Sequence, residues 1–564
     1  MVEWLVNPAL VVMAGGLLAM MAPRAWLGAL AVTLPALGLM LLWQLPTGTY
    51  APATLFGLDL VTIRIDGLSR IWATIFHIAG GLAGLYAWHV RDRLQHAAAL
   101  VYAGAGIGAV LAADLVTLFI YWELTAIASV FLIWARGTAR SYRVGMRYLV
   151  IQIISGLLLM AGAIIHYRAT GSLAFDHLGL ETPGGWLIFL AFGIKCAFPL
   201  LHNWLQDAYP EATVTGTVVL SVFTTKLAVY ALARGFAGEE ILITIGATMT
   251  AFPIFFAVIE NDLRRVLAYS LNNQLGFMVV GIGIGTEMAL NGAAAHAFAH
   301  ILYKALLFMS MGAVLYRVGT IKASELGGLY KSMPLTAVFC IIGAMSISAF
   351  PLFSGFVTKS MILTAAAVEH HWIAWLVLLF ASAGVLDHSG IKVPFFSFFH
   401  HDVGHRVPEA PWNMLAAMGT TAFLCIAIGV YPAPLYAILP FAVDYAPYTA
   451  AHVITQLQLL LFAALAFTTL FRNGWYPPEV PALNLDTDWL YRRLAPTLLA
   501  RIRSVTGDSM EALGTLAANT GRRGLALTRR VYQPDGVFAK PWGTGIMTLW
   551  VAALLAAYLL FYFG

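Results

Sequence analysis

Charged residues are scarce in this chain of 564 residues. Only 10% of them are Asp, Glu, Lys or Arg, whereas soluble proteins carry about 25%. Hydrophobic residues make up 60% of the chain, and the mean hydropathy is +0.81. This balance excludes an ordinary soluble globular protein. Apolar runs long enough to cross a hydrocarbon core of about 30 Å recur along most of the sequence, so the composition predicts an α-helical membrane protein.

Cysteine and nucleotide-binding motifs are also scarce. The three cysteines, Cys196, Cys340 and Cys425, lie in apolar stretches without a CxxC motif or a His/Cys cluster, which argues against a structural zinc or iron–sulfur site. Neither a P-loop nor a GxGxxG motif after a strand is present, so nucleotide binding has no support. We therefore expect no cofactor and no bound metal. The net charge of +5 indicates membrane orientation rather than binding to nucleic acid.

The apolar runs predict an all-α polytopic membrane protein with about 16 transmembrane helices. The first run has no basic segment before it and no cleavage site after it, so we interpret it as a membrane helix rather than a signal peptide. Residues 54–66 alternate apolar and polar side chains, which predicts a short hairpin outside the membrane. The expected helices span residues 5–22, 26–43, 67–89, 97–113, 114–135, 147–167, 184–205, 213–234, 239–259, 263–284, 287–316, 334–367, 373–399, 412–436, 454–471 and 543–563.

The loops between these helices alternate between a strongly basic side and a side with few basic residues. The positive-inside rule makes the basic side cytoplasmic, so we expect a multi-pass protein of the cell inner membrane with both termini on the outer, periplasmic side. Residues 472–542 are basic, and their arginines are interleaved with apolar residues. A solvated loop with short helices and an amphipathic helix on the cytoplasmic membrane face both stay open for this segment. Its glycines argue against one long uninterrupted helix; they are Gly507, Gly514, Gly521 and Gly524.

Lysine is rare but unusually placed. The chain has eight lysines against 24 arginines, and five lysines fall inside predicted helices. A desolvated lysine can lose its proton, whereas arginine cannot. Five unpaired charges at the bilayer centre would cost on the order of 15 kcal/mol, so these lysines must be paired, hydrated or neutral, or must reach the interface by snorkelling. They are Lys195, Lys226, Lys304, Lys359 and Lys392, of which Lys392 lies nearest to a cytoplasmic helix end.

Other ionisable residues accompany the lysines inside the apolar runs. Glu123 lies in the middle of a predicted helix and is the natural counter-charge for a buried lysine. His296, His300 and Lys304 follow one another at intervals of four, which puts them on one face of a helix. The local sequence offers no carboxylate to complete a metal site. Since histidine titrates near neutrality, we favour a proton wire.

An internal repeat organises the central part of the chain. The motif Ala-Phe-Pro-Leu interrupts two apolar runs, at 197–200 and at 349–352, and broken helices in membranes occur where they line a cavity or pack inside protein. The flanking lysines are 31 residues apart in the first copy and 33 in the second. Five helices in each copy would invert one repeat relative to the other. The predicted segments are residues 1–96 with the hairpin, the repeats 97–234 and 239–399, the C-terminal helices 400–471, the basic segment 472–542 and a terminal transmembrane helix at 543–564.

Five stretches of the central part of the chain carry family motifs. They lie at residues 114–133, around Trp122-Glu123, and at 193–207, 265–270, 296–308 and 353–359. With these motifs the sequence resembles the antiporter-like subunits shared by respiratory complex I, membrane-bound hydrogenases and Mrp-type multisubunit Na+/H+ antiporters. The resemblance covers roughly residues 50–400, and the D-type subunits of the Mrp antiporters are the branch that it most resembles. The basic segment and last helix are instead similar to the lateral helix and terminal anchor of the largest complex I antiporter-like subunit.

The resemblance implies a function and a role for each matched residue. Glu123 and Lys195 would pair in the half-channel through which protons enter, Lys226 would relay, His300 and Lys304 would connect the two halves, and Lys359 would be the base where protons leave. The implied function is proton translocation in an Mrp-type monovalent cation/proton antiporter, beside other membrane subunits and with Na+ or another monovalent cation as co-substrate. Two alternatives stay open: a proton-pumping subunit of a complex I, hydrogenase-type or inorganic-carbon uptake complex, and a static assembly scaffold.

Overall fold

The computed structural model describes residues 7–55, 57–481, 484, 486–532 and 543–563, and parts of the predicted first helix, basic segment and last helix lie outside these ranges. The chain forms two compact units, residues 1–484 and 485–564, each of which is described by itself. Among the described residues, twelve helices have the length and apolar composition needed to cross a membrane. The predicted class of a multi-pass helical membrane protein is therefore confirmed.

The chain begins with two helices and a β-hairpin. Antiparallel strands β1 and β2 pair tightly, with Leu55 opposite Leu58, so the predicted hairpin is confirmed but starts earlier than residue 54. Asp66 caps the next helix by accepting a hydrogen bond from the Ser69 amide. The elements are α2 (Pro8–Met21), η1 (Arg24–Trp26), α3 (Leu27–Gln44), β1 (Gly48–Leu55), β2 (Leu58–Ile65) and α4 (Gly67–Tyr86).

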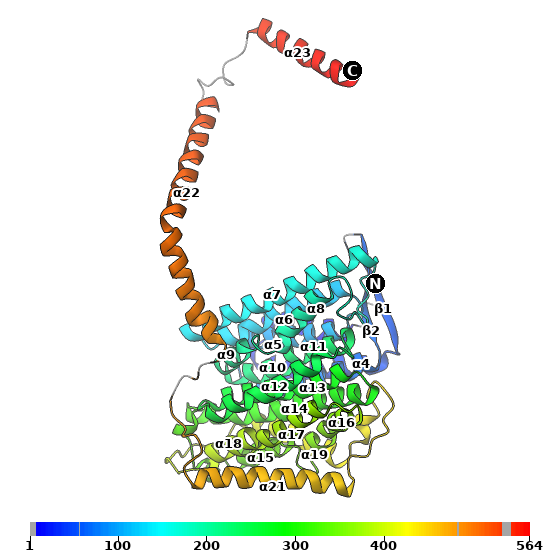
Figure 1. Cartoon of the computed structure of the whole chain (residues 1–564), viewed down its shortest axis with the longest axis vertical. Helices are drawn as coiled ribbons and strands as arrows, with labels where there is room; N and C mark the ends of the chain where they lie inside the picture. Colours follow the sequence, from blue (N-terminus) through cyan, green and yellow to red (C-terminus); the bar gives the residue numbers. More distant parts are fainter. Residues whose placement is uncertain (1–6, 56, 482–483, 485, 533–542, 564) are drawn as a thin grey trace. The chain divides into compact units, whose positions relative to one another are not determined.

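The remaining helices of the first unit run side by side in a bundle (Figure 1). They are α5 (Arg93–Leu111), α6 (Leu115–Trp134), α7 (Ala139–Thr170), α8 (Gly185–Cys196), α9 (Asn203–Glu211), α10 (Val214–Val222), α11 (Thr224–Gly235), α12 (Ile241–Ile259), α13 (Leu263–Ile284), α14 (Glu287–Val318), α15 (Pro334–Ile347), α16 (Ser354–Val368), α17 (Trp372–Val385), α18 (Lys392–Pro394), α19 (Trp412–Val430), α20 (Ala433–Tyr436) and α21 (Ala450–Arg472). Short 3₁₀ turns, η2 (Ala323–Glu325) and η3 (Leu329–Lys331), follow α14.

Helix α14 is the centre of this bundle. It has 32 residues, and nearly all of its side chains between Ala289 and Val314 are buried. It packs against α4, α10, α13, α15, α16 and α19, which come from both predicted repeats and from their flanks. A titratable side chain on this helix is therefore shielded from lipid and from bulk solvent on every side.

The two Ala-Phe-Pro-Leu motifs break their helices in the same way. Helix α8 stops before Ala197 and α15 stops shortly before Ala349, and both alanines adopt left-handed backbone angles, with φ of 62° and 56°. The two leucines that close the motifs, Leu200 and Leu352, are also left-handed. Such angles cost a non-glycine residue roughly 1–2 kcal/mol, so surrounding packing must stabilise both breaks.

A third break was not predicted. The expected span 213–234 is confirmed over Val214–Gly235, but its helix is interrupted at Phe223, where α10 ends at Val222 and α11 begins at Thr224. The Tyr102 hydroxyl accepts a hydrogen bond of 3.0 Å from the Thr224 amide, and the Lys226 ammonium donates one of 2.6 Å to the Ser221 carbonyl. The two side chains thus bond to the Thr224 amide and the Ser221 carbonyl, which in an unbroken helix would bond to backbone groups four residues away. Neither proline nor glycine marks the position.

The predicted helix 373–399 also needs correction at its end. After α17 the chain forms two π-helical segments, η4 (Leu386–Ile391) and η5 (Phe395–Phe399), with α18 between them. The wider π turns place Lys392 at the start of α18, away from the position that a regular helix would give it. Segments of this kind are frequent at functional sites.

The second unit contains η6 (Leu490–Leu494), α22 (Ala495–Tyr532) and α23 (Thr544–Phe563). Helix α22 is continuous over 38 residues, so the prediction that glycines interrupt it is wrong. A methyl group added at Gly514, Gly521 or Gly524 would meet nothing within 4 Å. Each exposed glycine costs about 1 kcal/mol relative to alanine, which weakens a helix without breaking it.

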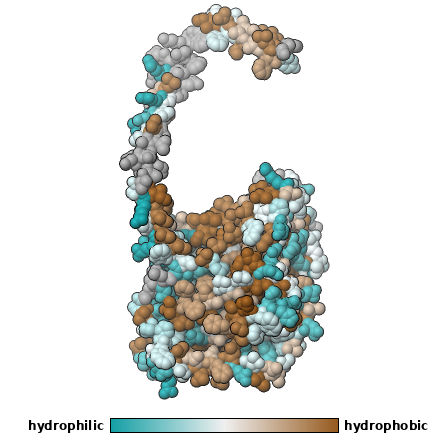
Figure 2. Space-filling view, viewed as in Figure 1, coloured by the Kyte–Doolittle hydropathy of each residue, from teal (hydrophilic) through white to brown (hydrophobic). Residues whose placement is uncertain are grey.

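Apolar side chains dominate the middle of the first unit's surface, and hydrophilic side chains gather toward the two ends of its helices (Figure 2). Large hydrophobic residues are also exposed on α7, α12, α17 and α21, among them Leu157, Phe255, Ile373 and Phe462. Such a band is expected where a protein surface contacts the hydrocarbon core of a bilayer. All three cysteines are free and buried beneath it.

Candidate functional site

All five lysines predicted to lie inside helices are buried. Their exposed fractions are 0% for Lys195, Lys226, Lys304 and Lys392 and 1% for Lys359. The snorkelling alternative is therefore wrong, including for Lys392. A buried ammonium needs oxygen partners or the loss of its proton, so the surroundings of each lysine decide what it can do.

Lys195 lies at the last turn of α8, against α6. Its ammonium donates to the Trp122 carbonyl at 2.6 Å and to the Thr125 hydroxyl at 2.8 Å, and it lies 4.4 Å from the centre of the Trp122 ring. Glu123, on the same turn of α6, attracts Lys195 electrostatically. Among the described residues the two side chains form no ion pair within 4 Å, so Glu123 and Lys195 are neighbours rather than a closed pair.

Gly156 on α7 makes room for the Glu123 carboxylate. A Cβ atom at position 156 would lie 1.4 Å from the Glu123 Oε1 atom. This oxygen is buried and has no hydrogen-bond partner within the described part of the chain. The carboxylate is thus placed against a bare helix backbone, and the absence of a side chain on α7 determines where it sits.

The histidines of α14 differ from one another. His296 contacts the Thr358 hydroxyl through Nδ1 at 3.1 Å and the Gln274 carbonyl oxygen through Nε2 at 3.2 Å. Tyr303 donates to the same Gln274 oxygen at 3.1 Å. His300 has no hydrogen-bond partner at either ring nitrogen among the described residues, and the same is true of the Lys304 ammonium. The three side chains therefore do not form a direct hydrogen-bonded wire.

Lys359 lies one turn into α16, directly after the second break. Its ammonium donates to the Ile347 carbonyl, the last of α15, at 3.0 Å, and it lies 4.9 Å from the centre of the Phe277 ring. The break therefore supplies the oxygen that the lysine uses. No carboxylate of the described residues forms an ion pair with Lys359.

Lys392 has the most complete set of partners. Its ammonium contacts the Val258 carbonyl at 2.6 Å, the Glu260 carbonyl at 2.8 Å and the Ala257 carbonyl at 3.3 Å. The Glu479 carboxylate lies 2.8 Å away and is 7% exposed. The sequence indicated Lys392 as the lysine nearest the interface, yet it is the most firmly bonded of the five.

Five further polar residues belong to this site and were missed from the sequence. Gln274 lies beside His296. Ser270 and Ser389 form a hydrogen bond of 2.7 Å, and Ser389 contacts His388 at 2.9 Å. The run Asn272-Asn273-Gln274 inside an apolar helix was an available signal, because buried amides in a membrane helix face protein. Glu479 gave no signal, since it lies in a loop more than 80 residues from Lys392.

Electrostatic repulsion connects the lysines from Lys226 onward, whereas Lys195 interacts with Glu123. Lys304 is repelled by both Lys226 and Lys359, and His388 is repelled by Lys304, Lys359 and Lys392. The site is therefore a row of like charges across the middle of the bundle. Protonation of one member disfavours protonation of the next, which is the physical requirement for moving a proton along a row.

Two carboxyl groups at the loop end of this row have a pKa above the ordinary value for glutamate. Burial raises the pKa of Glu479 above its ordinary value, although attraction by Lys392 acts in the opposite direction. Burial also raises the pKa of Glu260, against the attraction of Arg265. Both groups lie in loops outside the spanning helices.

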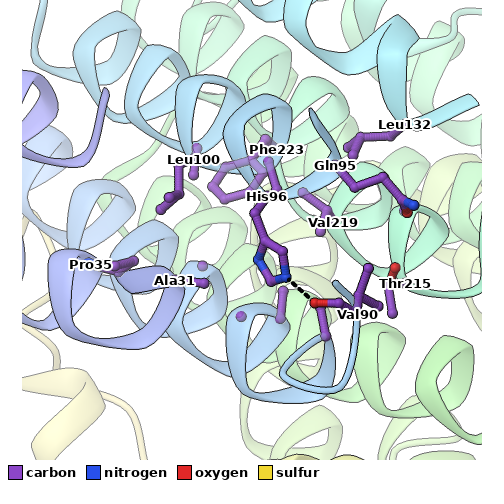
Figure 3. Close-up of a pocket in the computed structure, with 17 residues that line it drawn as sticks. Ala31, Pro35, Val90, Gln95, His96, Leu100, Leu132, Thr215, Val219 and Phe223 are labelled. Atoms are coloured by element: carbon purple, nitrogen blue, oxygen red, sulfur yellow. Dashed lines mark hydrogen bonds between the residues drawn. The ribbon is translucent and has the colours of Figure 1, made fainter. Parts of the chain in front are cut away.

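A narrow pocket lies beside the third break (Figure 3). Its volume is about 30 Å³, which exceeds the roughly 10–15 Å³ that a single water molecule requires. His96 lies in it, with its Nε2 atom 3.0 Å from the Val90 carbonyl, and Phe223, the residue at the break, is part of its lining. The pocket therefore ends at the turn that positions Lys226.

Known proteins resemble this chain in sequence. Residues 112–386 match a family described as NADH:quinone oxidoreductase/Mrp antiporter, transmembrane. The chain is 29% identical over 419 residues to the D-type subunit of the Na(+)/H(+) antiporter of Alkalihalophilus pseudofirmus, covering 70% of this chain and 83% of that protein. It is 28% identical over 400 residues to NAD(P)H-quinone oxidoreductase chain 4 of Synechococcus elongatus, covering 66% and 75%.

A solved structure shares the fold. A chain of the Mrp complex from Dietzia sp. DQ12-45-1b superimposes with a TM-score of 0.76 at 24% sequence identity. The superposition covers 93% of this chain and 63% of that one. The resemblance predicted from the motifs is thereby confirmed for the family and for the fold.

Proposed function

Residues 112–386 of this chain belong to the NADH:quinone oxidoreductase/Mrp antiporter transmembrane family, and from that premise we propose that the chain is the proton-translocating membrane subunit of an Mrp-type monovalent cation/proton antiporter. The proton row consists of Glu123, Lys195, Lys226, His296, His300, Lys304 and Lys359, with Lys392 at its loop end. Other membrane subunits complete the complex, and Na+ or another monovalent cation is the co-substrate.

One observation carries this proposal: Lys304 is fully buried and has no hydrogen-bond partner among the described residues. A static structural lysine would require a partner, because an uncompensated buried charge costs several kcal/mol. Lys304 lies between Lys226 and Lys359, which repel it. A neutral amine in that position accepts a proton when a neighbouring lysine loses one.

The same observation argues against a static scaffold. A scaffold gains nothing from titratable groups in its core, and apolar residues of similar volume would serve it as well or better. We also infer that segments 97–234 and 239–399 are inverted repeats, which is supported by the identical left-handed residues at their breaks. In this arrangement both termini face the periplasm, and protons enter near Glu123 and leave near Lys359.

The test is proton transport by the assembled complex in inside-out vesicles, followed by quenching of a pH-sensitive dye. Lys359→Ala and Glu123→Ala should each abolish cation-driven proton movement. Lys322→Ala is the matched control, because Lys322 is half exposed and pairs with Glu325 at 3.0 Å on the surface. Wild-type transport by both buried-site variants would refute the proposal.

A second candidate keeps the proton row but changes the partner complex. The similarity to a quinone oxidoreductase chain is within 1% identity of the similarity to an antiporter subunit, so a redox-linked proton pump is the alternative. Purification of the native complex separates the two, since a redox complex carries flavin and iron–sulfur absorbance. Na+-dependent proton movement without that absorbance supports the antiporter.

A further inference from the structure

We propose that the oxygen atoms around Lys392 form a binding site for a dehydrated monovalent cation, and that the protonated lysine occupies this site as an internal competitor. The inference rests on the proposed function, because it supplies the point where cation and proton exchange. The site consists of the carbonyls of Ala257, Val258 and Glu260 and the carboxylate of Glu479.

The number of oxygens points to a cation site. Four oxygen atoms lie within 3.3 Å of the Lys392 nitrogen, whereas an ammonium group has only three N–H donors. A spherical ion has no such limit, and carbonyl oxygens replace the hydration shell of monovalent cations in selective channels. The geometry is therefore that of ion coordination, with the ammonium in the position of the ion.

The end of α12 explains why these carbonyls are available. The last four carbonyls of a helix have no internal donor, and α12 ends at Ile259. Ala257 and Val258 lie in that last turn, and the extended backbone of Glu260 adds its own carbonyl. The helix dipole places partial negative charge at this end, and helix C-termini of this kind bind Na+ in transporters.

The other buried lysines lack this environment. Lys226 and Lys359 each donate to one carbonyl, and Lys195 donates to one carbonyl and one hydroxyl. Among the five, and within the described residues, only Lys392 has a carboxylate within 4 Å. A cation that displaced any other lysine would meet too few oxygens.

A pocket lies beside the site. It has a volume of about 580 Å³, and His400, His401, Tyr476 and Glu479 are part of its lining. Glu479 lines the pocket and also contacts Lys392, and its carboxylate oxygens are buried between the two. In the proposed exchange this side chain must therefore move to let a cation pass from the pocket to the carbonyls. Further charged groups around Lys392 are Glu260, Asp387 and His388, and Arg265 lies 3.6 Å from Glu260.

The exchange balances in charge. Protonated Lys392 releases its proton to water in the pocket, and the neutral amine withdraws from the oxygens. One monovalent cation then takes its place. One proton leaves for each cation that binds. An N–H bond of Lys392 breaks and an O–H bond to water forms, so the total charge of the site is unchanged.

The experiment measures equilibrium binding of radioactive rubidium and sodium to the purified assembled complex at several pH values. Wild-type affinity should fall about tenfold for each unit decrease in pH where Lys392 titrates, because one proton competes with one cation. Lys392→Met should remove this pH dependence and tighten binding at least tenfold, an estimate from the loss of the competitor. Lys392→Met combined with Glu479→Gln should abolish binding.

Two variants control for simple loss of a buried charge. Arg234→Met removes a largely buried charge that lies outside the row and pairs with Asp66 at 2.8 Å, and its rubidium binding should equal that of the wild type. Lys392→Arg retains a permanent charge and should abolish binding. Equal, pH-independent binding by the wild type and Lys392→Met would overturn the inference, as would binding that survives in Glu479→Gln.

Dye-quenching measurements on the same preparations separate this inference from the proposed function. Normal proton movement in Lys359→Ala together with pH-competitive rubidium binding would refute the proton row and retain the cation site. Abolished proton movement in Lys359→Ala without any lysine-dependent cation binding would refute the cation site and retain the row. Size-exclusion chromatography establishes that each variant assembles.

Discussion

The two broken helices have the same backbone but carry different chemistry. At both breaks the amide of the alanine donates to the carbonyl three residues earlier, and the amide of the phenylalanine donates five residues back. Alignment of Ala197 with Ala349 places Asp207 opposite Lys359 and Lys195 opposite Ile347. The fold thus repeats a turn that frees carbonyls, whereas the titratable side chains stand at different positions relative to the two turns.

The difference concerns acidic neighbours. Lys195 has Glu123 within electrostatic range, and the first copy also carries Asp207, which pairs with Arg147 at 3.2 Å. Lys359 has a carbonyl and an aromatic ring but no carboxylate ion pair among the described residues. We infer that the first copy tolerates a charged lysine and that the second favours a neutral one.

The largest effect should come from replacing each lysine with arginine. Lys359→Arg places a permanent charge beside one carbonyl, which should destabilise the complex by about 3–5 kcal/mol, the usual cost of an uncompensated buried charge. Lys195→Arg keeps Glu123 as a counter-charge and should assemble. Yield and thermal unfolding of the complex measure the difference, and equal losses in both variants would break the comparison.

The next effect concerns the hydroxyl group near each lysine. Thr125 accepts a hydrogen bond from the Lys195 ammonium, whereas Thr358 contacts His296 instead of Lys359. Thr125→Val should cost about 1.5–3 kcal/mol, the range for bonds to charged groups, and Thr358→Val about 1 kcal/mol. Thermal unfolding checks both values. A larger loss in Thr358→Val would mean that His296, not Lys195, is the charged group.

A smaller effect is expected from Gly156→Ala, which displaces the Glu123 carboxylate from α7. Proton movement should fall about tenfold, equivalent to 1.4 kcal/mol, while the complex still assembles, because the far end of a side chain can move aside. Gly80→Ala is the control, since its new methyl group would meet atoms no nearer than 3.8 Å. Unchanged transport in Gly156→Ala would show that the position of Glu123 is unimportant.

An ion pair between Asp66, which caps α4 outside the spanning helices, and Arg234, in the last turn of α11, gives the first copy a distinct pH dependence. Burial opposes ionisation of Asp66, but hydrogen bonds and attraction from Arg234, at 2.8 Å, more than compensate and lower its pKa. The stabilisation is therefore present above the unfolded pKa of about 3.9 and is lost as the pH falls through the folded value. Asp66→Asn should lower the unfolding temperature at pH 7, and its effect should be smaller at pH 2.5. An equal loss at both pH values would exclude the ion pair.

The smallest effect should be common to both copies. Ala197→Gly and Ala349→Gly each remove a left-handed strain of roughly 1–2 kcal/mol, and the greater freedom of unfolded glycine offsets about half of it. Each variant should be stabilised by less than about 1 kcal/mol. Thermal unfolding of the pair sharpens the comparison, because shifts of opposite sign would mean that the two breaks differ in backbone energy.

The sequence predicted the parts of the fold that depend on apolar runs and proline. The helices, the hairpin and the breaks beside Pro199 and Pro351 belong to this group. The break at Phe223 could not be predicted, because it depends on Tyr102 from another helix rather than on a local residue. The continuous helix α22 was missed for a different reason: at Gly514, Gly521 and Gly524 no neighbouring atom lies close enough to require a glycine.

The candidate site was predictable only in part. Buried lysines and histidines stand out in an apolar chain, so the members of the row were found. Their partners were not, since a carbonyl has no signature in sequence and Glu479 lies in a distant loop. Lys392 illustrates the limit: its place near a helix end suggested contact with the interface, whereas tertiary packing supplied four oxygens.

The burial of all three native cysteines makes this chain suitable for labelling without further engineering. Cys196, Cys340 and Cys425 are each 0% exposed, so maleimides that cannot cross a membrane will leave the wild-type chain unmodified. A single cysteine placed in a surface loop, at Lys322 for one side or at Ser172 for the other, becomes the reactive thiol of the chain. Comparison of the labelling in intact cells with that in inside-out vesicles then shows on which side of the membrane each loop lies.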